Sequence, residues 1–155
     1  MKGLYTVEDI MPESLPNVND SSLVIRLRTA DTSFMILADT CYRSGPILDD
    51  MWGDYLKSDI VQVAHHGQWP SVERLYHSIA AKVVLIPAVT SRYKNDILDT
   101  RWDEQTEAIL SYAKDLYVVG DSTVILELPY TILNNKQAAY DAIISYVPKE
   151  SEPTS

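Results

Sequence analysis

Residues 61–67 read Val61-Gln62-Val63-Ala64-His65-His66-Gly67, an apolar run that ends in two adjacent histidines and a glycine. The β-branched residues predict a strand, and the glycine predicts a tight turn directly after it. A similar run, Phe34-Met35-Ile36-Leu37-Ala38, ends in Asp39. On neighbouring strands, this carboxylate and one imidazole would meet at one edge of a sheet and form half of a dinuclear metal site.

Strands and helices alternate around these two motifs. Turn-forming residues 29–33 join two apolar segments, so an antiparallel hairpin is expected there. The expected strands are 22–28, 34–38, 59–64, 83–86, 116–119 and 123–128, and the expected helices are 46–57, 71–80, 103–114 and 136–146. This order predicts an α/β fold, with one mixed β-sheet and helices mainly on one face.

The chain reads as a single domain. Residues 1–20, rich in Pro, Asn, Asp and Ser, are expected to form an irregular entry segment, residues 21–147 the domain, and residues 148–155 a flexible tail. A length of 155 residues, with 46% hydrophobic and 23% charged residues, is typical of a globular domain with a proper core.

Composition also limits the classes of partner that are expected for this chain. The net charge of −9 disfavours passive binding to nucleic acid or to anionic membranes, because both need a positive surface. The single cysteine, Cys41, excludes an intramolecular disulfide, and packing is its simplest role. No apolar run reaches the length of a signal peptide core or a membrane span, so no membrane association and a cytoplasmic location are expected.

Four motifs follow one another in a recognisable order. They are Asn19-Asp20-Ser21-Ser22, Ala38-Asp39, His65-His66-Gly67-Gln68 and Val83-Val84-Leu85-Ile86. Together they resemble the C-terminal half of a metallo-β-lactamase-fold hydrolase, in the branch that includes the metal-hydrolase domain of ComEC-like DNA-uptake proteins. The resemblance covers roughly residues 19–128. Two departures are small, since Ala38 stands where the family usually has glycine and Gln68 where it usually has serine.

The resemblance implies half of a four-layer αββα sandwich and a role for three residues in binding metal. Asp39 would be the carboxylate that bridges two divalent metals, with zinc the first choice. One of His65 and His66 would be the last ligand, and His66, beside the glycine, is favoured. The first half of the family fold supplies a His-x-His-x-Asp-His motif, which this sequence lacks, and its only other histidine is His77, in an expected helix.

The missing ligands leave several functions open. A catalytic zinc needs about three protein ligands, so the isolated chain is expected to hold no catalytic residues, to bind metal weakly if at all and to be inactive. It would be part of a metal-dependent hydrolase, as a fragment or as a truncated protein. Alternatively, it is a non-catalytic interaction module, or a separate N-terminal half-domain or a second copy completes the site. Self-association would use an apolar sheet face, for which the candidates are Leu23, Ile25, Val61 and Val63.

Overall fold

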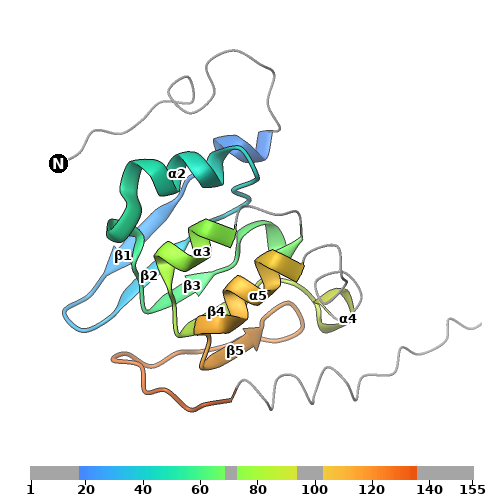
Figure 1. Cartoon of the computed structure of the whole chain (residues 1–155). Helices are drawn as coiled ribbons and strands as arrows, with labels where there is room; N and C mark the ends of the chain where they lie inside the picture. Colours follow the sequence, from blue (N-terminus) through green and yellow to red (C-terminus); the bar gives the residue numbers. More distant parts are fainter. Residues whose placement is uncertain (1–17, 69–72, 94–102, 136–155) are drawn as a thin grey trace, which may run out of the picture.

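The computed structural model describes residues 18–68, 73–93 and 103–135. These residues form a five-stranded sheet in the order β1-β2-β3-β4-β5 (Figure 1). Strands β1 and β2 pair antiparallel, and β2, β3, β4 and β5 are parallel. The bounds are Ile25–Arg28 for β1, Ser33–Ile36 for β2, Ile60–Gln62 for β3, Val83–Ile86 for β4 and Asp115–Val118 for β5. The predicted α/β class and the mixed sheet are confirmed.

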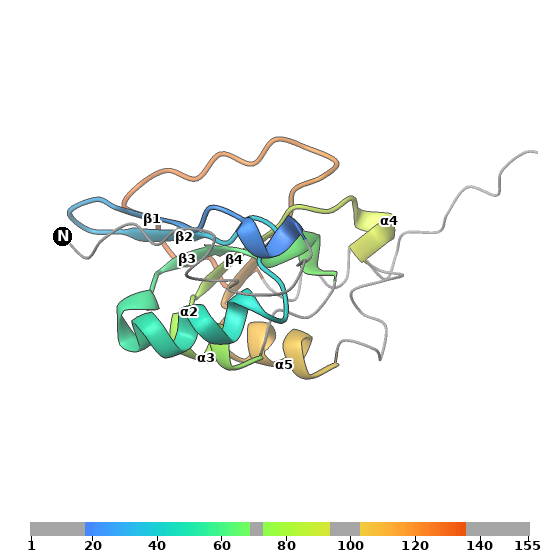
Figure 2. The same cartoon turned by 90° about the horizontal axis from the view of Figure 1, so that it is seen from above.

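The longer helices follow the parallel strands and cover one side of the sheet. Helix α2 (Ser44–Trp52) follows β2, α3 (Glu73–Ile79) follows β3, and α5 (Asp103–Tyr112) precedes β5. Figure 2 shows all three on the same side, as the sequence predicts. Shorter elements complete the described part, namely the 3₁₀ turns η1 (Val18–Ser21), η2 (Gly53–Leu56) and η3 (Ala64–Gly67) and the single helical turn α4 (Thr90–Arg92).

Strand register separates the side chains into two faces. Met35 pairs with Val61, Val61 with Val84, and Val84 with Leu116, and this row belongs to the core beneath the helices. The helices add Leu75, Ile79 and Ile109 to the same core. The next row, Leu27, Phe34, Ile60, Val83 and Asp115, therefore faces the other way.

Residues 119–135 run along the side of the sheet opposite the helices (Figure 2). The buried carboxylate of Asp115 holds their end, because it accepts hydrogen bonds from the Tyr130 hydroxyl and from the amides of Leu133 and Asn135, at 2.7–2.8 Å. The predicted strand 123–128 is wrong, since this segment has no regular secondary structure. The alternating β-forming residues of this segment pair with no strand in the described part of the chain, and the Asp115 side chain holds the residues that follow it.

A further expectation needs correction. Val61 and Val63 do not belong to an exposed apolar face, because both are buried in the core under the helices. Of the segment 1–20 expected to be irregular, residues 18–20 are described, and they belong to the turn η1. The predicted helix 136–146, the tail 148–155 and most of the segment 1–20 lie outside the described residues.

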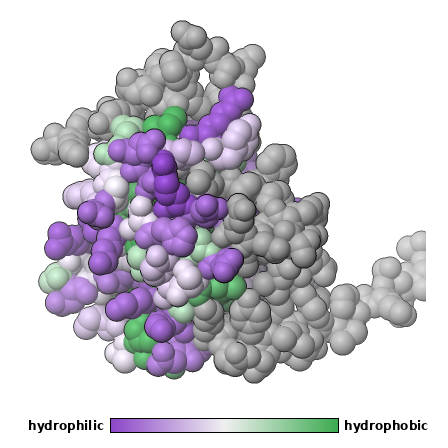
Figure 3. All heavy atoms as spheres, in the orientation of Figure 1, coloured by the Kyte–Doolittle hydropathy of each residue, from purple (hydrophilic) through white to green (hydrophobic). Residues whose placement is uncertain are grey.

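The surface over the helices is predominantly hydrophilic where Figure 3 colours it. Within the described residues, no helix combines the length and the apolar character that crossing a membrane requires.

Candidate functional site

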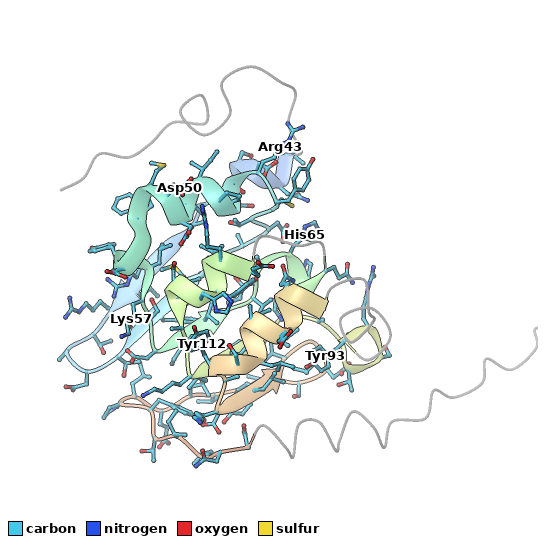
Figure 4. The ribbon with its side chains drawn as sticks, viewed as in Figure 1. Arg43, Asp50, Lys57, His65, Tyr93 and Tyr112 are labelled. Carbon is cyan, nitrogen blue, oxygen red and sulfur yellow. The ribbon has the colours of Figure 1, made fainter. Side chains whose placement is uncertain are left out.

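The two sequence motifs meet at one edge of the sheet. Asp39 lies just beyond β2 and the His65-His66 pair just beyond β3, and these strands are parallel neighbours. The His65 amide donates to the Ala38 carbonyl at 2.8 Å, which ties the two connections together. The Ala38 amide donates in turn to the Gln62 side chain at 3.1 Å. Figure 4 shows His65 at this end of the sheet, with Lys57 at the opposite end.

The backbone at this edge is held in an unusual conformation. Ala38, His65 and His66 have positive φ values of 48°, 47° and 58°, and Gly67 follows with a φ of 80°. A left-handed conformation costs an L-residue about 1–2 kcal/mol, so three such residues store considerable strain. Neighbours keep the turn in place, since the Ala64 amide donates to the Tyr76 hydroxyl at 3.2 Å and the Gln68 amide to the His65 carbonyl at 2.9 Å. Strain of this kind gathers at functional sites.

His66 faces Asp39 with a defined ring nitrogen. Its Nδ1 atom lies 2.7 Å from the Pro87 carbonyl oxygen, which can only accept a hydrogen bond, so Nδ1 carries a proton. In the neutral imidazole, the lone pair is then on Nε2, which lies 3.8 Å from Asp39 Oδ1. Both side chains are about half exposed. This separation is longer than a hydrogen bond, and it places a lone pair opposite a carboxylate oxygen.

His65 has a different environment. The Asn19 amide nitrogen and the Cys41 sulfur each lie 3.4 Å from its Nδ1 atom. The amide nitrogen is a donor, so in the neutral ring of His65 Nδ1 is the acceptor and the proton is on Nε2. Burial, followed by the negative charge of Asp20, raises the pKa of the Cys41 thiol, which therefore stays protonated at neutral pH. The two histidines thus have opposite tautomers.

The donor set fits part of a metal site. Two ligands of one zinc ion, each about 2.0–2.2 Å from it, lie about 3–4 Å apart, depending on the angle between them. The 3.8 Å between His66 Nε2 and Asp39 Oδ1 falls in this range. The hydrogen bond from Nδ1 to a carbonyl is also the usual support for a metal-binding histidine. Among the described residues, however, no group of three His, Cys, Asp or Glu side chains could hold a metal ion.

Sequence reasoning did not find several residues that shape this edge. The Pro87 carbonyl follows strand β4, and Asn19 and Ser22 contact the site from η1 and the residue after it. Asn19 and Ser22 belong to the motif Asn19-Asp20-Ser21-Ser22, to which the sequence pattern assigns no role at this edge. His77, outside the site, contacts the Tyr112 hydroxyl at 3.1 Å.

Comparisons with protein-family models, with curated proteins and with solved structures find no significant match to this chain.

Proposed function

We propose that this chain carries one half of the metal site of a metallo-β-lactamase-superfamily hydrolase. The observation that supports this proposal most strongly is the pairing of Asp39 Oδ1 with Nε2 of His66 at 3.8 Å, while the Pro87 carbonyl holds the other ring nitrogen. In the neutral form of the His66 ring, a lone pair and a carboxylate oxygen face each other, and such a pair of donor atoms attracts a cation. The motif order in the sequence supports the same proposal.

Each residue has a separate role in this proposal. His66 supplies its Nε2 lone pair as a ligand, and Pro87 keeps the ring in the orientation and tautomer that ligation needs. Asp39 supplies negative charge and a second donor atom. A bound divalent metal, zinc first, would lower the pKa of a water molecule and so provide the nucleophile for ester, amide or phosphodiester hydrolysis. With two donors here, the remaining ligands come from another polypeptide segment or another subunit.

Equilibrium dialysis against zinc tests the proposal. The chain should bind zinc weakly, because water fills most of the coordination shell of a two-donor site. Asp39→Ala and His66→Ala should each abolish this binding. His77→Ala is the matched control, because it removes a histidine from helix α3, away from the sheet edge, and should leave binding unchanged. The isolated chain should show no turnover in an esterase and phosphodiesterase panel.

Besides the absence of any zinc binding by the wild-type chain, two outcomes would contradict this assignment. One is zinc binding that survives both Asp39→Ala and His66→Ala. The other is tight stoichiometric zinc with turnover by the chain alone, lost in Asp39→Ala, since that would mean a complete site.

A second candidate, an interaction module, is supported by exposed apolar side chains outside the core. On strand β1 and the segment 119–135, these are Leu27, Ile125, Leu128 and Leu133, each at least half exposed. A surface of this kind suits a second copy or a separate half-domain. Light scattering should then detect association that Ile125→Lys weakens. Val18→Lys is the control, because Val18 is 80% exposed and Ile125 83%. A monomer at every concentration would contradict self-association.

A further inference from the structure

We propose that the segment Asn19–Ser22 positions both motifs of the candidate site, with Asn19 and Ser22 as its two positioning residues. The segment contacts the Asp39 connection and the His65-His66 turn, which are otherwise far from it in the sequence. The effect on zinc affinity rests on the proposed function. The effect on the metal-free protein rests on the contacts of this segment alone.

The geometry of a 3₁₀ turn explains why these two residues act together. The Ser22 amide donates to the Asn19 carbonyl at 3.1 Å, which closes one turn of three residues. Side chains three positions apart in such a turn lie on the same side. Asn19 and Ser22 are therefore on one side, while Val18 and Ser21, also three apart, are exposed on another.

Each of the two side chains holds one motif. The Ser22 hydroxyl accepts a hydrogen bond from the Asp39 amide at 3.2 Å. This contact fixes the backbone directly after Ala38, where the positive φ turns the chain away from strand β2. The Asn19 side chain contacts Nδ1 of His65 at 3.4 Å and so orients the ring next to His66. A single short segment thus contacts both motifs, in addition to the direct hydrogen bond from the His65 amide to the Ala38 carbonyl.

The middle of the segment is anchored in the protein. Asp20 is 1% exposed, and its Oδ1 atom accepts hydrogen bonds from the Ser44 amide at 3.1 Å and the Ser44 hydroxyl at 2.9 Å. Ser44 is the first residue of helix α2, and its hydroxyl also accepts a hydrogen bond from the Cys41 amide at 3.1 Å. The segment is therefore fastened to the same β2–α2 connection that carries Asp39.

Zinc affinity, measured by equilibrium dialysis, is the first test. Ser22→Ala should weaken binding about 10-fold, as expected when a supporting contact behind a ligand is lost. Ser22→Thr keeps the hydroxyl and should restore the affinity. Ser21→Ala is the matched control, because it removes an exposed hydroxyl of the same turn, one that donates to the Val18 carbonyl at 2.6 Å.

Two measurements on the metal-free protein separate this inference from the proposed function. Ser22→Ala should speed hydrogen exchange of the Asp39 amide, and Ser21→Ala should not. Asn19→Ala should move the ¹⁵N signal of His65 Nδ1, while the signals of His77 stay in place. The melting temperature of each variant shows that the fold persists.

The outcomes are distinct. If the wild-type chain takes up no zinc, the proposed function fails, and amide exchange and imidazole signals still decide the positioning inference. Unchanged Asp39 exchange in Ser22→Ala, together with unchanged His65 signals in Asn19→Ala, would overturn the inference, whatever the zinc affinity. Equal zinc affinities of Ser22→Ala and Ser21→Ala would also count against it.

Discussion

Nδ1 of His66 lies 2.7 Å from the carbonyl oxygen of Pro87, the residue that follows strand β4. This contact connects the turn after β3 to the connection after β4. The His66 ring is therefore held by the backbone that follows β4, although both proposed ligands follow other strands. The contact also leaves Nε2 as the atom that faces Asp39. The chemistry of the edge therefore depends on a backbone carbonyl that no sequence motif marks.

Ala38→Gly should stabilise the protein. Ala38 has a φ of 48°, and glycine adopts this region without strain. At the middle of the expected ranges, relief of about 1.5 kcal/mol of strain, less about 0.75 kcal/mol for the greater freedom of glycine in the unfolded chain, leaves a gain of roughly 0.75 kcal/mol. Urea unfolding measures this gain. Ala80→Gly should behave alike, because Ala80 also has a φ of 48°.

The control for this prediction is Ala30→Gly in the exposed β1–β2 hairpin. Ala30 is not among the described residues with positive φ, so glycine relieves nothing there and should be neutral or destabilising. A loss of stability in Ala38→Gly equal to that in Ala30→Gly would mean that the turn at Ala38 is not left-handed.

Gly120→Ala should be strongly destabilising. A Cβ atom at this position would lie 2.3–2.4 Å from the backbone of Ala88 and Val89, which cannot move aside as a flexible side chain could. We expect a loss of about 1–3 kcal/mol or more in the free energy of unfolding, as for an overpacked core. Gly53→Ala is the control, since a Cβ there meets nothing within 4 Å and only its φ of 41° opposes the change. A loss well below about 1 kcal/mol in Gly120→Ala would contradict the close approach of residues 88 and 120.

The stability that Tyr130 contributes should depend on alkaline pH. Burial, followed by hydrogen bonds with Tyr117 and Asp115, raises the pKa of Tyr130 far above its ordinary value of 10.0. Because the folded pKa is the higher one, the contribution is complete below pH 10 and is lost as the pH rises through the folded pKa. At neutral pH, Tyr130→Phe should cost about 1.5–3 kcal/mol, the value of a hydrogen bond to a charged group.

Denaturant unfolding of the wild type and Tyr130→Phe across this pH range measures the effect. Their difference should be constant up to pH 10 and shrink above it. Tyr117→Phe keeps the 2.8 Å bond from Tyr130 to Asp115 and should cost less. A difference that grows with alkaline pH would contradict the assignment.

Sequence patterns were sufficient to predict the fold and the site where the contacts are local or where the strands are neighbours in the chain. The strand 83–86 has the predicted bounds, and the meeting of Asp39 with a histidine at one edge follows from parallel pairing of β2 with β3. Sequence patterns did not predict which face of the sheet Val61 and Val63 occupy. A strand buried on both faces shows no alternation of polar and apolar residues that would distinguish the two faces.

Long-range contacts explain what else the sequence could not reveal. Asn19 reaches His65 across 46 positions, and Ser22 reaches Asp39 across 17. The segment 123–128 has the composition of a strand, yet its path depends on the distant carboxylate of Asp115, which holds residues 130–135. Neither relationship leaves a periodic signal in the sequence.

The most direct test of the half-site is a zinc titration followed by ¹H–¹⁵N NMR of the imidazole rings. Before zinc is added, His66 should show the pattern of a proton on Nδ1. With zinc, we expect Nε2 of His66 to shift progressively up to millimolar concentrations, with His77 unaffected and no shift of His66 in Asp39→Ala. A zinc-induced shift confined to His65 or His77, or no shift of His66 at millimolar zinc, would contradict the assignment of Asp39 and His66 as metal ligands.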